Sequence, residues 1–135
     1  MMRMQVLAAA AVLMAGCATA SGGAAADRTA ALGEDFRLAR GETAEVGGLS
    51  VRFAQVVEDS RCPLGVQCIR AGDAKIQLAL RTSDARRTVV LATGDALPTA
   101  ADFAGYEVRL VTLDPPRRRD DPAPAYVATL RVLRR

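Results

Sequence analysis

The feature that most constrains this sequence is an alternation of apolar and polar residues with a period of two. Every second side chain of an extended strand lies on the same face, so this alternation predicts strands with one buried and one hydrated face. The pattern runs through residues 49–54, 74–81, 106–111 and 126–133. Shorter strand candidates are residues 36–39, 43–46 and 86–92.

Turn signals separate these segments. Gly47 and Gly48 stand between two strand candidates and predict a tight hairpin, because both glycines accept a positive φ. Further turn signals are residues 40–42, 82–84 and 93–95. About seven strands at this spacing predict an all-β chain, either an antiparallel β-sandwich or a small barrel. We expect helix only at residues 98–103, as one or two turns.

Composition narrows the range of functions. The 135 residues are 50% hydrophobic, which fits one folded domain and excludes a disordered chain. The chain has no histidine, which excludes Ser-His-Asp and Cys-His triads and the commonest zinc ligand. The formal net charge is only +3, so we predict no nucleic-acid partner. We predict no cofactor.

The N-terminal residues 1–16 have the layout of a signal peptide. Arg3 precedes an apolar run at residues 6–14, which is too short to cross a bilayer, since that takes about 20 residues. The sequence Leu-Met-Ala-Gly-Cys that ends at Cys17 resembles a bacterial lipobox. The resemblance implies cleavage before Cys17 and a diacylglycerol on its sulfur. The alternative is an ordinary secretory signal cleaved at the small residues 18–20.

We therefore expect a lipoprotein signal peptide at residues 1–16, a lipidated tether at residues 17–33 and a β domain at residues 34–135. The predicted location is the bacterial cell envelope, with the domain facing the periplasm and the lipid anchor holding it to the membrane. Ala18 follows Cys17, where enteric lipoproteins kept in the inner membrane tend to have Asp. That resemblance favours the outer membrane.

The cysteine count predicts a disulfide. The chain has three cysteines, and lipidation of Cys17 leaves Cys62 and Cys68. Because the envelope is oxidising, we expect these two to form a disulfide. So short a loop adds little stability, and we therefore interpret the disulfide as a device that shapes the loop. The alternative is a redox-active dithiol, although the spacing is not C-x-x-C and the nearest cations along the chain are Arg61 and Arg70.

Residues 59–74 carry the most specific pattern, D-S-R-C-P-x4-C-x-x-A-G-x-A. The pattern resembles that of small bacterial envelope proteins, uncharacterised lipoproteins in which it recurs. Flanking matches at residues 41–53 and 106–110 extend the resemblance over most of the mature chain. Arg70 stands where those proteins often have Trp. The resemblance implies a location but no activity.

We predict that residues 58–73 form a candidate binding loop with Asp59, Ser60, Arg61, Arg70 and Asp73. A structural interpretation stays open, in which Asp59 and Ser60 fix the turn and Arg61 pairs with a nearby carboxylate or bonds backbone carbonyls. In the binding interpretation, a loop closed by a disulfide is pre-organised and loses little entropy when it binds. The predicted function is a non-catalytic binding or structural module, with an envelope protein as possible partner.

The alternative is a divalent-cation-dependent protein or an enzyme centred on Glu58, Asp59, Ser60 and Asp73. Carboxylates suit Ca²⁺ or Mg²⁺, but adjacent strand residues point to opposite faces. Ser60 as a nucleophile would need a base, and Lys75 is the only lysine. We therefore predict no catalytic residue and no metal site.

A charged, proline-rich run occupies residues 115–125 and includes three consecutive arginines and two aspartates. Its prolines exclude a central strand. We interpret the run as a solvated loop, or alternatively as a contact for phosphate-bearing lipid headgroups or another anionic partner.

Overall fold

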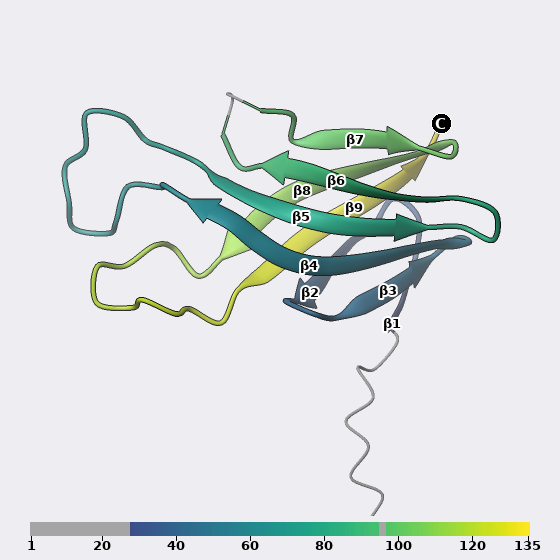
Figure 1. Ribbon diagram of the computed structural model, residues 1–135, viewed down its shortest axis with the longest axis horizontal. Helices are drawn as coiled ribbons and strands as arrows, with labels where there is room; N and C mark the ends of the chain where they lie inside the picture. Colours follow the sequence, from purple (N-terminus) through teal and green to yellow (C-terminus); the bar gives the residue numbers. More distant parts are fainter. Residues whose placement is uncertain (1–27, 95–96) are drawn as a thin grey trace, which may run out of the picture.

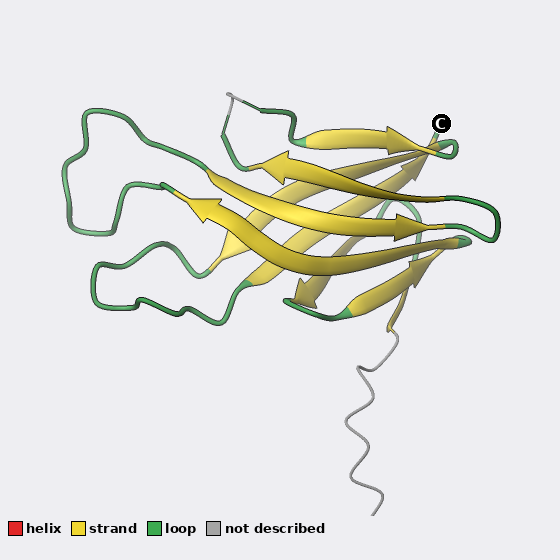
Figure 2. Cartoon of the chain, in the orientation of Figure 1, coloured by secondary structure: helices red, strands yellow, loops and turns green. Residues whose placement is uncertain are grey.

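The computed structural model describes residues 28–94 and 97–135, which form nine strands (Figure 1). The described part of the chain is all β and contains no helix (Figure 2). The strands are β1 (Arg28–Ala30), β2 (Asp35–Ala39), β3 (Thr43–Val46), β4 (Leu49–Asp59), β5 (Ala74–Arg81), β6 (Arg86–Ala92), β7 (Ala100–Phe103), β8 (Tyr106–Asp114) and β9 (Val127–Arg134).

The strands form two layers that face each other as a sandwich, so the predicted all-β sandwich is confirmed and the small barrel is not. One sheet has five strands in the order β1-β3-β4-β5-β6, and the other has four in the order β2-β9-β8-β7. All neighbouring strands pair antiparallel except β1 and β3, which are parallel. In Figure 1, β4, β5 and β6 lie in front of β8 and β9.

The core lies between the two sheets and follows from the alternation of residue types. In β5, every second residue is fully buried, and the intervening ones are partly exposed. Phe53, Leu78 and Leu130 are among the largest side chains with no exposed surface. Burying such a side chain stabilises the fold by about 1.5–3 kcal/mol, so the apolar faces of the strands drive the two sheets together.

The predicted hairpin at Gly47 and Gly48 is confirmed. Both glycines have positive φ, at 57° and 93°, and Val46 pairs with Leu49 across the turn. The Tyr106 hydroxyl donates a hydrogen bond of 2.5 Å to the Gly47 carbonyl. This bond joins the turn of the five-stranded sheet to the start of β8 in the other sheet.

Two expectations about secondary structure need correction. The helix expected at residues 98–103 is wrong, because Ala100–Phe103 pair with β8 as the edge strand β7. Pairing and the packing of Phe103 against the core override the helix preference of alanine here. The sheet also begins at Arg28, inside the expected tether, because β1 adds to the edge of β3.

No helix in the described residues is long and apolar enough to cross a membrane. The signal peptide, Cys17 and most of the expected tether lie outside the described residues.

Candidate functional site

Two long loops leave the sandwich at the same end (Figure 1). The disulfide loop, residues 60–73, joins β4 to β5, and the proline-rich loop, residues 115–126, joins β8 to β9. One loop extends from the five-stranded sheet and the other from the four-stranded sheet. The candidate functional site is the surface that these two loops form together.

Two irregularities in β4 determine which way the first site residues point. Two register shifts interrupt the pairing of β4 with β5 before the strand ends. Beyond them, Asp59 stands opposite the buried Ala74, whereas Glu58 stands opposite Lys75 and binds it at 2.8 Å. β-Bulges re-aim side chains in this way. Asp59 therefore lies on the interior side of the sheet, where it meets residues of the opposite sheet.

Arg61 uses its guanidinium to join the two loops. Its Nε lies 2.9 Å from Oδ1 of Asp59, and its Nη2 lies 2.8 Å from Oδ2 of the same carboxylate. Nη1 donates to the Leu113 carbonyl at 2.8 Å, and Nη2 also donates to the Pro115 carbonyl at 2.9 Å. Four hydrogen bonds from one side chain require a planar group with several donors in fixed directions. Among the side chains, only the arginine guanidinium provides this.

Tyr126, at the far end of the proline-rich loop, completes the same cluster. Its hydroxyl donates to Oδ2 of Asp59 at 2.9 Å. Burial would raise the pKa of Asp59, but the hydrogen bonds from Arg61 and Tyr126, together with the guanidinium charge, outweigh burial and lower it. Burial and the bond to this carboxylate raise the pKa of Tyr126. The cluster is thus an ionised pair with a neutral phenol at neutral pH.

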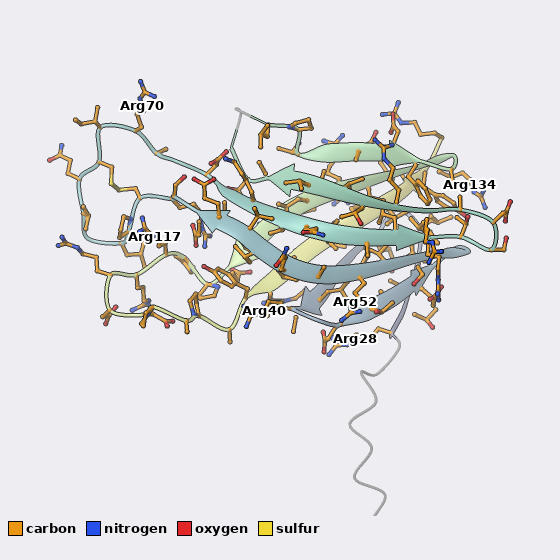
Figure 3. The ribbon with its side chains drawn as sticks, viewed as in Figure 1. Arg28, Arg40, Arg52, Arg70, Arg117 and Arg134 are labelled. Carbon is orange, nitrogen blue, oxygen red and sulfur yellow. A yellow bond between two sulfur atoms is a disulfide. The ribbon has the colours of Figure 1, made fainter. Side chains whose placement is uncertain are left out.

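Two further hydrogen bonds link the loops nearer their tips. The backbone N–H of Leu64 donates to the Arg117 carbonyl at 3.0 Å, and Nη1 of Arg117 donates to the Arg61 carbonyl at 2.9 Å. In Figure 3, Arg117 lies where the two loops face each other. A hollow of about 610 Å³ lies at this junction. Its lining residues are Asp59, Pro63, Val66, Arg117, Arg118, Arg119, Asp121, Pro122, Pro124 and Tyr126.

Ser60 and Asp73 close the base of the disulfide loop. The Ser60 amide donates to the Asp73 carbonyl at 2.7 Å, and the Asp73 amide donates to Ser60 Oγ at 3.2 Å. Gly72 has a φ of 66°, and a Cβ there would lie 1.8 Å from the Ser60 carbonyl oxygen. The close approach of these two segments therefore requires glycine. Oδ2 of Asp73 is buried with no hydrogen-bond partner among the described residues.

The tip of the disulfide loop is exposed. Cys62 and Cys68 form the predicted disulfide, with their Cα atoms 5.9 Å apart. Leu64 is 55% exposed, and Ile69 is fully exposed. Arg70 projects from the outer side of the loop, away from the proline-rich loop (Figure 3). Of the five residues predicted for the binding loop, Arg70 thus faces solvent, and the other four hold the base of the loop.

The residues of the cation or enzyme hypothesis do not converge on one point. Glu58 and Asp59 point to opposite faces of the sheet, as predicted, and each contacts a different cationic side chain. Ser60 and Asp73 bond to each other. Within the described part of the chain, no three His, Cys, Asp or Glu side chains gather as a metal site would require.

Sequence reasoning missed the partners that the proline-rich loop supplies. Tyr126 and Arg117 are separated from Asp59 and Arg61 by more than fifty residues, and no local pattern connects them. The sequence holds one signal that could have pointed to them: each of the two loops joins two strand candidates that follow each other in the chain and are predicted to be antiparallel. No family model, no curated protein sequence and no solved structure matches this chain.

Proposed function

We propose that this chain is an envelope lipoprotein whose β domain binds a partner protein, without catalysis, through the joined disulfide and proline-rich loops. The lipobox that ends at Cys17 supports the lipid anchor, and the residues after it support a tether that leaves the domain in the periplasm. Ala18 supports the outer membrane as the site of anchoring. The partner is an envelope protein, because the loops face the compartment in which the anchor holds them.

The observation that carries this proposal is a rigid base beneath an exposed apolar tip. Asp59, Arg61 and Tyr126 fasten the two loops at their base, so that the surface above them is formed before any partner arrives. A pre-organised surface loses less entropy when it binds. Leu64 and Ile69 expose their apolar side chains on the disulfide loop, and covering them with a partner would remove apolar surface from water.

The polar groups at the base support a structural role over a chemical one. The Nε, Nη1 and Nη2 atoms of Arg61 all donate hydrogen bonds, either to the Asp59 carboxylate or to a backbone carbonyl. Ser60 Oγ donates to the Asp73 carbonyl at 2.9 Å, lies 3.3 Å from Asp73 Oδ1 and accepts from the Asp73 amide, and these bonds close the base of the disulfide loop. The cation-dependent or enzymatic alternative stays a prediction that no contact in the described residues favours.

Site-specific photocrosslinking tests the proposal. A benzoylphenylalanine in place of Leu64 or Ile69, in the full-length protein expressed in its own cells, should give one discrete adduct with an envelope protein. The matched control replaces Val111, an apolar residue that is 41% exposed on the four-stranded sheet, away from the loops. Adducts of equal yield and mass from Val111, or none from Leu64 and Ile69, would contradict the proposal.

A further inference from the structure

A second hollow lies on the outer face of the five-stranded sheet, away from the two loops. It has a volume of about 530 Å³ and runs across β3, β4, β5 and β6. Arg52, Arg81 and Arg86 line it, together with Ala79. Arg87 also lines it, but it stands opposite the buried Leu80 and its guanidinium donates to the Asp102 carbonyl at 3.3 Å. Ala79 stands opposite Arg52 on one side, so its small side chain leaves room between the longer ones. We name this feature the arginine hollow.

The register places two of these arginines directly opposite each other. Arg81 pairs with Arg86 at the end of the β5–β6 hairpin, and Ser50 stands on the other side of Arg81. Like charges directly opposite on neighbouring strands are destabilising. The fold therefore bears an electrostatic cost at this point, and an anion bound between the guanidinium groups would relieve it.

The outer face of the four-stranded sheet also places two arginines directly opposite each other, Arg109 and Arg131, but carboxylates pair with both of them. There, Arg37, Arg109 and Arg131 each have a carboxylate partner, at 3.7, 2.7 and 2.7 Å. Among the described residues, by contrast, no carboxylate forms an ion pair with Arg52, Arg81 or Arg86. The arginines on the outer face of the four-stranded sheet are therefore paired with carboxylates, whereas Arg52, Arg81 and Arg86 on the five-stranded sheet are not.

The neighbouring groups indicate what kind of anion would fit. The Ser50, Thr43 and Thr88 side chains line the arginine hollow and offer hydroxyl donors, and Glu45 is the one carboxylate in its wall. Guanidinium forks and hydroxyls together match the oxygens of a phosphate group. The arginines span three adjacent strands, a width of about 10 Å, which exceeds a single phosphate and suits two or more.

We infer that the arginine hollow binds an anion that carries two or more phosphate groups. The same chemistry is present in a soluble diphosphate and in the phosphate headgroups of a membrane. The inference does not depend on the proposed function of the loops, because the hollow shares no lining residue with the hollow between the loops.

Titration calorimetry of the full-length protein in neutral detergent, with inorganic pyrophosphate at low ionic strength, tests this inference. We expect binding at one site, weakened about tenfold or more in the Arg81→Gln/Arg86→Gln variant, which loses two charged donors. The control is Arg37→Gln/Arg131→Gln, which removes the same charge from the outer face of the four-stranded sheet and should change the affinity by less than about twofold. Equal weakening in both variants, or no binding to the wild type, would overturn the inference.

Two additional measurements make the result unambiguous. The Arg81→Gln/Arg86→Gln variant should melt no lower than the wild type, since it removes a like-charge pair, so lost binding cannot be attributed to unfolding. Titration of the protein in the same detergent with phosphatidylglycerol, and separately with phosphatidylcholine, distinguishes the sources. Binding that needs phosphatidylglycerol, is lost in this variant and is competed by pyrophosphate assigns the site to membrane headgroups. Pyrophosphate binding without phosphatidylglycerol binding assigns it to a soluble ligand.

Discussion

Arg61 and Asp59 form a two-pronged ion pair at the point where the loops of the two sheets meet. Their side chains are only 17% and 9% exposed, and both oxygens of the carboxylate are engaged. The same guanidinium also holds the Leu113 carbonyl near the end of β8 and the Pro115 carbonyl at the start of the proline-rich loop. One side chain therefore neutralises a largely buried charge and fastens two segments that are distant in sequence.

Arg61→Lys should destabilise the protein by about 3 kcal/mol, because an ammonium group keeps the charge but cannot reach both carboxylate oxygens and both carbonyls. Urea denaturation followed by circular dichroism measures the change. Arg131→Lys is the control, since Arg131 pairs with Asp35 on an exposed face and should tolerate the exchange. If the two variants unfold at the same urea concentration, Arg61 is not the clamp that we describe.

Gly72→Ala should destabilise the protein by more than about 4 kcal/mol, because the new Cβ would overlap the Ser60 carbonyl oxygen at 1.8 Å. Gly65→Ala is a matched control in the same loop. Gly65 also has a positive φ, at 73°, but no atom lies within 4 Å of its Cβ position, so only the backbone strain of about 1–2 kcal/mol remains. Thermal melts of both variants check the difference, and similar melting temperatures would refute the proposed close approach.

The stability that Asp59 contributes should depend on pH in a defined direction. Its pKa is lowered in the folded protein, against about 3.9 in an unfolded chain. The folded state therefore holds this proton less tightly, and the contribution is complete above the unfolded pKa and is lost as the pH falls through the folded pKa.

Asp59→Asn measures that contribution. The wild type should exceed this variant in unfolding free energy at pH 7, and the gap should shrink as the pH is lowered toward about 3. Asp120→Asn, which removes an exposed carboxylate of the proline-rich loop, should show a gap that stays small throughout. A gap for Asp59→Asn that is constant with pH would mean that the ion pair does not lower its pKa.

Replacing both Cys62 and Cys68 with Ser should leave the β-sheet circular dichroism spectrum intact and destabilise the protein by about 2 kcal/mol, because the closed loop is short. The expected larger effect is on binding, since the tip that carries Leu64 loses its fixed shape. Crosslinking yield at Leu64 measures this effect. An unchanged yield would show that the disulfide does not shape the contact.

Much of the fold follows from the sequence because one face of each sheet is buried. The alternation in residues 74–81 and the Gly47-Gly48 turn match β5 and the β3–β4 hairpin closely. The pairing of Cys62 with Cys68 followed from counting cysteines. These features are local, and residue type alone determines them.

The rest depends on relationships between distant segments. The register shifts of β4 break the alternation after Phe53, so the pattern marks neither the full length of the strand nor the direction of Asp59. β7 forms because β8 offers a free edge, which no pattern in residues 98–103 reveals. The bond from Tyr126 to Asp59 joins residues 67 positions apart. Only the packing of the two sheets brings these groups together.

The central claim is that the two loops act as one binding surface, and crosslinking from both loops tests it most directly. Benzoylphenylalanine in place of Leu64 in the disulfide loop and, separately, in place of Arg118 in the proline-rich loop should capture the same partner, identified by the mass of the adduct. Adding Arg61→Lys to each protein should reduce both yields together. Adducts from only one loop, or different partners from the two, would contradict the account.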